Sequence, residues 1–204
     1  DDKRVSAENA AEVAAFVEAG GKFGIATGRV PGILGSIDRD LPVNAPCILF
    51  NGAGLYDLAQ RRFLAMHPLD RRACTRIAQQ AVRLQGDACV QVFTDSAIYE
   101  INPHQADDPQ TVLERICVVK SPLNEVPDIF LKLLISQTPA RLKKLFESLD
   151  TPQLHAEFSA FQSSGNYLEF VKAGVSKGSA LSDVRARCGD ARTILAIGDY
   201  ENDL

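Results

Sequence analysis

The sequence predicts an α/β protein with a parallel sheet, into which a lobe of the α+β type is inserted. The first observation is an alternation at the start of the chain, where a helix over residues 6–19 precedes buried-type strands at 22–26 and 46–50. The second is a change of pattern in the middle of the chain, where strand pairs replace this alternation. The third is the return of a helix at 177–187 and an apolar strand at 193–197. Strands that alternate with helices favour a parallel sheet.

The first helix is predicted from its two ends and its apolar spacing. Ser6 stands at the N-cap position, and apolar residues recur at i, i+3, i+4 and i+7 from Ala10 to Val17. Gly20 and Gly21 then end the helix. After the strand at 22–26 we expect a loose helical segment that reaches about Asp38.

The middle of the chain is predicted to form the inserted lobe, over residues 68–168. Thr138 and Pro139 begin the clearest amphipathic helix, in which apolar residues from Leu142 to Leu149 follow helical spacing. A short turn between two apolar runs predicts a β-hairpin. The predicted elements of this lobe are helices over 70–85 and 138–149 and strands over 89–93, 97–101, 129–135, 155–161 and 167–171.

The remaining two parts, residues 1–67 and 169–204, are predicted to form one core domain. In its second part Ser176 is the expected N-cap of the helix, and a polar loop follows the strand at 193–197. We expect no internal repeat in either domain.

Composition and charge exclude several classes of protein. The 204 residues carry a net charge of -4, which argues against nucleic acid as the main partner, since phosphate backbones are bound by clustered Lys and Arg. The longest apolar runs fall far short of the roughly 20 residues of a membrane helix. Five cysteines are scattered without a C-x-x-C pair, so we expect small buried thiols in a cytoplasmic protein rather than a nucleophile.

Polar residues stand where ligands bind in open α/β sheets, after a strand or at the start of the next helix. Thr27 follows the strand at 22–26 and offers a hydroxyl and loop N–H groups to a phosphate oxygen. Its alternative role is that of a turn residue. Lys177 adds an ammonium group to a positive helix N-terminus, which suits an anion, although most lysines there point to solvent.

The loop after the last apolar strand is the third polar site. Asp199, Asn202 and Asp203 place two carboxylates and an amide in one short loop, and oxygen ligands of this kind suit Mg²⁺. The alternative is an acidic turn in which an Asp acts as N-cap. The loop is not an EF-hand, which needs a longer run of spaced ligands and a distant Glu.

Four short segments, taken in order, carry a resemblance to a known family. They are ATGR at 26–29, NGA at 51–53, GVSKG at 174–178 and GDYEND at 198–203. The set resembles the successive motifs of Cof-type phosphatases of the haloacid dehalogenase superfamily, over nearly the whole chain. The resemblance implies a Rossmann-like parallel-sheet core and an inserted cap domain of the C2B type, which closes over the site and selects the leaving group.

The resemblance also assigns roles to individual residues. Thr27 would bind the transferring phosphoryl group, and Lys177 would neutralise the phosphate and the nucleophile. Asp199 matches the Mg²⁺-binding carboxylate, Asn202 a phosphate or water contact, and Asp203 a second carboxylate at or beside the metal. Substrate contacts are further expected from Gly28, Arg29 and Asn51, although forming a turn is the stronger interpretation of Asn51.

The implied reaction is the hydrolysis of a small phosphorylated metabolite through an aspartyl-phosphate, assisted by Mg²⁺. In the family the nucleophilic aspartate belongs to a D-x-D-G-T motif, which the 204 residues do not contain. We expect the parent protein to carry it on an apolar strand before Asp1, with further α/β units after Leu204. Asp38 and Asp40 have D-x-D spacing but lack the following Gly-Thr and a preceding buried strand, so we reject them as the nucleophile.

Other functions stay open at this point. A nucleotide-binding module of the Rossmann type fits the sheet, but Asp57 stands where its third glycine belongs. A non-catalytic relative that binds a phosphorylated ligand, or a phosphotransferase such as a phosphomutase, is compatible with the same motifs. We expect a monomer or a homodimer, and nothing in the sequence selects the substrate.

Overall fold

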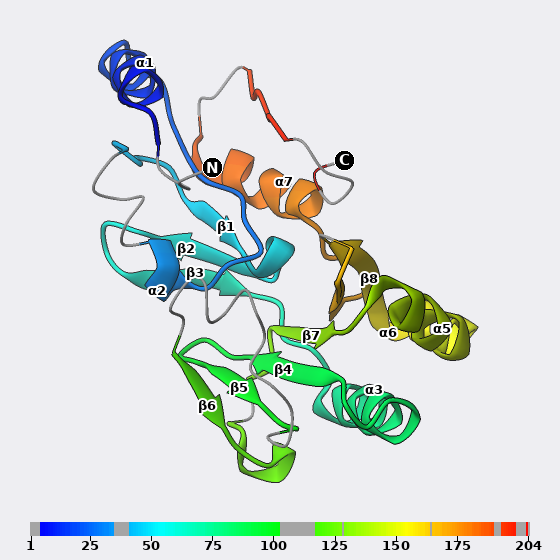
Figure 1. The fold of residues 1–204 in the computed structure, drawn as a ribbon. Helices are drawn as coiled ribbons and strands as arrows, with labels where there is room; N and C mark the ends of the chain where they lie inside the picture. Colours follow the sequence, from blue (N-terminus) through cyan, green and yellow to red (C-terminus); the bar gives the residue numbers. More distant parts are fainter. Residues whose placement is uncertain are drawn as a thin grey trace. The chain divides into compact units, whose positions relative to one another are not determined.

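The computed structural model describes residues 5–34, 41–102, 117–127, 129–163, 165–189, 193–198 and 203. The chain divides into two compact units (Figure 1). Unit 1 comprises Asp1–Met66 and Ser176–Leu204, and unit 2 comprises His67–Val175. In the described part of the chain, no helix is long and apolar enough to cross a membrane.

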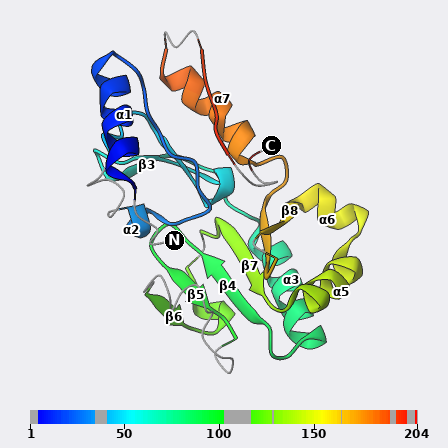
Figure 2. The same ribbon diagram turned by 45° about the horizontal axis from the view of Figure 1, so that its top comes forward.

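Unit 1 is built around a small antiparallel sheet in the order β1-β2-β3. The turn η1 follows β1 directly, and helix α7 packs beside both of them (Figure 2). Ile48 and Leu55 from the sheet and Ala180 and Val184 from α7 form an apolar cluster in this unit. The elements of unit 1 are α1 (Ala7–Glu18), α2 (Pro31–Leu34), β1 (Cys47–Leu49), η1 (Phe50–Gly52), β2 (Gly54–Asp57), β3 (Arg62–Met66) and α7 (Lys177–Arg187).

The described residues show the predicted parallel sheet only as a single bridge. Ala26 and Ile48 form it, and the backbone N–H of Thr27 donates to Ile48 O at 2.8 Å. The strand predicted over 22–26 is therefore reduced to this bridge. The strand predicted over 193–197 is not formed, and Leu195 and Ile197 are 82% and 90% exposed. An apolar run forms a strand only where neighbouring backbone completes its hydrogen bonds, and residues 193–197 have no paired strand within the described part of the chain.

Unit 2 contains a six-stranded sheet in the order β6-β5-β4-β7-β9-β8. All neighbours are antiparallel except β5 and β6. The predicted hairpin is confirmed as β4 and β5. The elements are α3 (Arg71–Leu84), β4 (Cys89–Phe93), β5 (Ile98–Glu100), β6 (Val118–Lys120), η2 (Leu123–Glu125), β7 (Lys132–Ser136), α5 (Pro139–Leu149), α6 (Pro152–Glu157), β8 (Phe158–Ser163) and β9 (Tyr167–Lys172).

Two details of unit 2 differ from the sequence prediction. The strand predicted over 155–161 begins three residues later, because residues 152–157 form helix α6. Thr151 caps this helix by accepting a hydrogen bond from Leu154 N at 3.1 Å, and Pro152 suits its first turn. The boundary suggested between residues 168 and 169 falls inside β9, which pairs along its length with β7 and β8.

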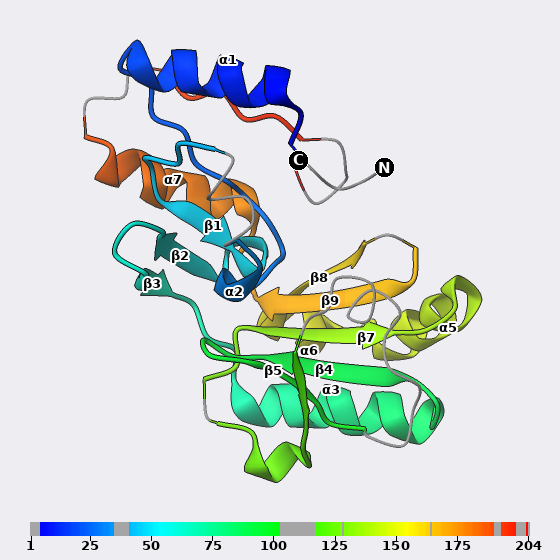
Figure 3. The ribbon, with the colours of Figure 1, turned by 60° about the vertical axis from the view of Figure 1, so that its left-hand side comes forward.

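The helices of unit 2 pack on one face of its sheet. Figure 3 shows α3 lying along the strands of this sheet. The N-cap of α3 is Asp70, which accepts from Ala73 N at 2.8 Å. Alternate strand residues supply the sheet side of the core, including Val90, Val92, Leu133, Ile135, Leu168 and Phe170.

Candidate active site

The loop that carries Thr27 lies against the side chain of Asn51. A β-carbon at Gly28 would be only 2.8 Å from Asn51 Oδ1, so any larger residue there would require the Asn51 side chain to shift. The hydroxyl of Thr27 accepts a hydrogen bond from Arg29 N at 3.3 Å. Two predicted site segments, ATGR and NGA, are therefore in direct contact.

The turn after β1 has an uncommon backbone conformation. Phe50, Asn51 and Gly52 have φ values of 50°, 56° and 108°, and all three are buried. Left-handed backbone at non-glycine residues costs of order 1–3 kcal/mol each and persists only where the surroundings hold it. Here hydrogen bonds hold it, because Asn51 N donates to Thr27 O at 3.1 Å and Phe50 N to Arg29 O at 3.3 Å.

The same turn touches the N-terminus of α7. A β-carbon at Gly52 would lie 2.2 Å from Ser176 O and 3.2 Å from Lys177 N. Ser176 caps the helix as predicted, in a reciprocal pair with Ser179. The positive end of α7 is therefore held beside the Asn51-Gly52 turn, which favours the binding of an anion there.

Lys177 lies in the first turn of α7 and pairs with Asp203. Its Nζ is 2.5 Å from Asp203 Oδ1, and the two side chains are 13% and 20% exposed. A lysine is mildly unfavourable at a helix N-terminus, and the carboxylate offsets that cost. Asp203 in turn packs on the backbone of Gly198, where a β-carbon would be 2.3 Å from Asp203 Cβ.

These contacts connect four of the predicted segments in unit 1. The loop with Thr27, Gly28 and Arg29 contacts the turn at Asn51, and Gly52 of that turn contacts the start of α7. Lys177 at the start of α7 then pairs with Asp203. Asp199 and Asn202 fall outside the described residues. The sequence did not indicate that Gly52 and Gly198 allow close contacts. Gly52 meets Ser176, which is far from it in the sequence, and Gly198 meets Asp203 only because the loop folds back.

The described part of the chain contains no group of three His, Cys, Asp or Glu side chains arranged to hold a metal ion. Of the two predicted metal ligands, Asp203 is described, and one of its oxygens accepts from Lys177. A carboxylate can bind a second partner through its other oxygen, so the chemistry of Asp203 is compatible with Mg²⁺.

The cysteines have no place in this site. None of the five forms a disulfide, and Cys47, Cys74 and Cys89 are buried as expected, whereas Cys117 is exposed and Cys188 partly so. Burial, with the nearby charge of Asp70, raises the pKa of the Cys74 thiol to about 12. A thiol with that pKa is not a nucleophile at neutral pH.

A comparison with protein families decides which family this site belongs to. The family described as haloacid dehalogenase-like hydrolase matches residues 1–204. The chain belongs to this family of hydrolases. The resemblance to its Cof-type members, inferred from the four motifs, is thereby confirmed.

Solved structures of this hydrolase family have the same fold. A haloacid dehalogenase-like hydrolase from Bacteroides thetaiotaomicron is 20% identical with a TM-score of 0.85, and the match covers all of this chain and 78% of that one. A HAD/COF-like hydrolase from Plasmodium vivax is 17% identical with a TM-score of 0.77, covering 100% and 74%. BT1666 from B. thetaiotaomicron, described among phosphatases of the superfamily, is 19% identical with a TM-score of 0.67, covering 91% and 66%. A search of the curated proteins found no match.

Proposed function

We propose that this hydrolase is a Mg²⁺-dependent phosphatase that acts on small phosphorylated metabolites. The observation that carries the proposal is the contact series in unit 1, from the Thr27 loop through the Asn51-Gly52 turn to Lys177 and Asp203. It places a hydroxyl, a helix N-terminus and an ammonium group in neighbouring segments, and these groups bind phosphate. The description of BT1666 among phosphatases supports the same reaction class.

In the proposed reaction an aspartate attacks phosphorus while the bond to the leaving oxygen breaks, and the leaving group takes up a proton. Water then hydrolyses the aspartyl-phosphate and releases inorganic phosphate. In the family the aspartate and the proton donor belong to a D-x-D-G-T motif, which the 204 residues do not contain. Thr27 would bind a phosphoryl oxygen, and Lys177 would stabilise negative charge on the phosphoryl group.

Asp199 and Asp203 would hold the Mg²⁺ ion, which reduces repulsion between the two anions and stabilises charge on the transferring group. Asp203 also keeps Lys177 in place, as the 2.5 Å pair suggests. Gly28, Arg29, Asn51 and Asn202 would contribute further contacts to phosphate or substrate. Unit 2 would act as the domain that selects the substrate.

The test is phosphate release from 4-nitrophenyl phosphate by the full-length protein, with and without Mg²⁺. Lys177→Ala should lower kcat by about 100-fold or more, because it removes a charge that stabilises the transition state. Lys143→Ala, an exposed lysine on α5 in unit 2, is the matched control and should retain full activity. No turnover by the wild type under any of these conditions would instead favour a non-catalytic phosphate binder.

A further inference from the structure

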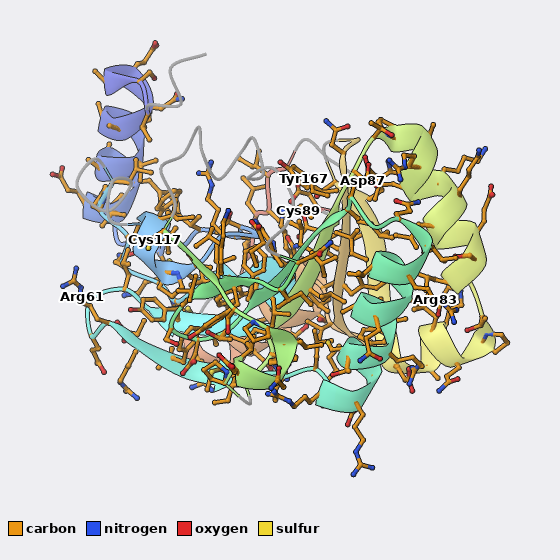
Figure 4. The ribbon with its side chains drawn as sticks, turned by 60° about the horizontal axis from the view of Figure 1, so that its bottom comes forward. Arg61, Arg83, Asp87, Cys89, Cys117 and Tyr167 are labelled. Carbon is orange, nitrogen blue, oxygen red and sulfur yellow. The ribbon has the colours of Figure 1, made fainter. Side chains whose placement is uncertain are left out.

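Three non-glycine residues in the described part of the chain have left-handed backbone: Phe50, Asn51 and Arg61, with φ values of 50°, 56° and 52°. Arg61 is exposed in the turn between β2 and β3, and its side chain points away from the protein (Figure 4). Phe50 is different, because its side chain is fully buried and bulky residues rarely adopt this conformation. Asparagine or glycine would reverse the chain here at a lower cost, so a phenylalanine at this position needs a separate reason.

The left-handed backbone at Phe50 turns two consecutive N–H groups towards the loop that carries Thr27. In a regular strand, successive N–H groups point to opposite sides, so only every second residue bonds to a given neighbour. Phe50 N donates to Arg29 O at 3.3 Å, and a regular strand would therefore point Asn51 N away from this loop. Instead, Asn51 N donates to Thr27 O at 3.1 Å. The conformation at Phe50 thus decides where the backbone of Thr27 is held.

The side chain of Phe50 packs on the hairpin formed by β2 and β3. Its ring centre is 6.1 Å from that of Phe63, and the two ring planes are 29° apart. A β-carbon at Gly54 would lie 2.9 Å from the Phe63 ring and 3.0 Å from the Phe50 ring, so both rings lie against the backbone of Gly54. Returning Phe50 to a negative φ would move its ring out of this packing and expose apolar surface. The packing of the ring therefore offsets the strain of the backbone.

The turn connects Phe50 to both parts of the proposed phosphate site. On one side, Asn51 N holds Thr27 O. On the other side, Gly52 lies against the start of α7, where a β-carbon would be 2.2 Å from Ser176 O. A shift of Phe50 would therefore disturb both contacts together.

We propose that Phe50 is a positioning residue of the phosphate site. Its ring, packed on the hairpin, keeps the turn left-handed, and the turn sets the spacing between the Thr27 loop and the start of α7. Because the ring is fully buried, Phe50 acts through the backbone and not by contact with substrate. The inference rests on the proposed function in treating these segments as a phosphate site, and it goes beyond that function by naming a residue outside the four motifs.

The experiment compares Phe50→Leu with the matched control Phe158→Leu in the full-length protein. Both substitutions remove a buried ring that packs against another ring, since Phe158 is 2% exposed and its ring centre is 5.7 Å from that of Phe170. Phe158 lies in β8 of unit 2, outside the turn. The quantity measured is the Kd for inorganic phosphate in the presence of Mg²⁺, by calorimetric titration at a temperature at which circular dichroism shows every variant to be folded.

Phe50→Leu should weaken phosphate binding by about tenfold or more, because a displacement of about 1 Å in a positioning element can cost about 100-fold. Phe158→Leu should leave the affinity within about twofold of the wild type. Wild-type affinity in Phe50→Leu would overturn the inference, and so would an equal loss in both variants, since general loosening of the fold would then explain it.

Phe63→Leu is the second variant should Phe50→Leu not fold. It removes the neighbouring ring but leaves the turn residues unchanged, so it should weaken phosphate binding by about threefold or more. Wild-type affinity in Phe63→Leu would then refute the inference.

The failure of the proposed function would give a different result. A wild type that binds phosphate but does not hydrolyse 4-nitrophenyl phosphate counts against the proposed function alone. If the wild type does not bind phosphate either, amide hydrogen exchange decides whether the ring holds the turn. Exchange of the Asn51 amide that is about tenfold faster or more in Phe50→Leu or Phe63→Leu than in the wild type supports the inference, and equal exchange refutes it.

Discussion

Substituting Gly52 by alanine tests whether the strained turn and helix α7 must be in close contact. The new β-carbon would lie 2.2 Å from Ser176 O and 2.5 Å from its carbonyl carbon, which are backbone atoms that cannot turn aside. Two costs therefore add. Alanine at φ 108° costs about 1 kcal/mol, and forcing apart the turn and the helix costs about 1–3 kcal/mol more. We expect Gly52→Ala to lower the free energy of unfolding by about 2–4 kcal/mol.

Gly20→Ala separates these two costs. Gly20 lies in the same unit with φ 91°, and a β-carbon there meets nothing within 4 Å. It should therefore lose only the conformational part, about 1 kcal/mol. The assay is urea unfolding followed by far-ultraviolet circular dichroism for both variants and the wild type. Equal destabilisation by Gly52→Ala and Gly20→Ala would refute the close contact between the turn and α7.

Three further predictions concern unit 2. Lys132→Met should lower the free energy of unfolding, measured in urea, by about 3–5 kcal/mol, because it leaves the buried Glu169 without the charge of Lys132. The double variant Lys132→Met/Glu169→Met should recover most of that loss, because it removes both charges. A thiol reagent near neutral pH should modify Cys117 of the native protein rapidly, because Cys117 is exposed. It should modify the buried Cys74 only after the protein unfolds, and rapid labelling of Cys74 would contradict its burial. Because the pKa of Cys74 is raised, its thiol favours folding below pH 9.0, and this contribution should be lost as the pH rises towards about 12.

Local signals in the sequence were sufficient for most elements of unit 2. The apolar spacing from Leu142 to Leu149 predicts α5, and those residues are the ones that α5 buries. The strand predicted over 155–161 is present as β8, but its start was placed three residues too early. Thr151 and Pro152 begin a helix that extends to Glu157, and this helix start outweighs the strand signal there. A capping signal is local and decisive, whereas a short apolar run is ambiguous.

Tertiary contacts account for what the sequence could not provide. The apolar run at 193–197 has strand composition, but a strand also needs paired neighbours, and composition does not report them. The order of motifs identified Thr27, Lys177 and Asp203 as candidates, yet not that Asp203 pairs with Lys177. The side-chain nitrogen of Gln91, which is buried and has no hydrogen-bond partner among the described residues, was equally hidden, since a single Gln in an apolar strand gives no sign of its partners.

The central claim is that separate segments of unit 1 form one phosphate site, and phosphate affinity tests it most directly. Calorimetric titration of the full-length protein with inorganic phosphate in the presence of Mg²⁺ should give binding that Thr27→Ala and Lys177→Ala each weaken by about tenfold or more. Thr75→Ala, a substitution on α3 in unit 2, should leave the affinity unchanged. Phosphate binding that is the same in the wild type and in both unit 1 variants would contradict the account.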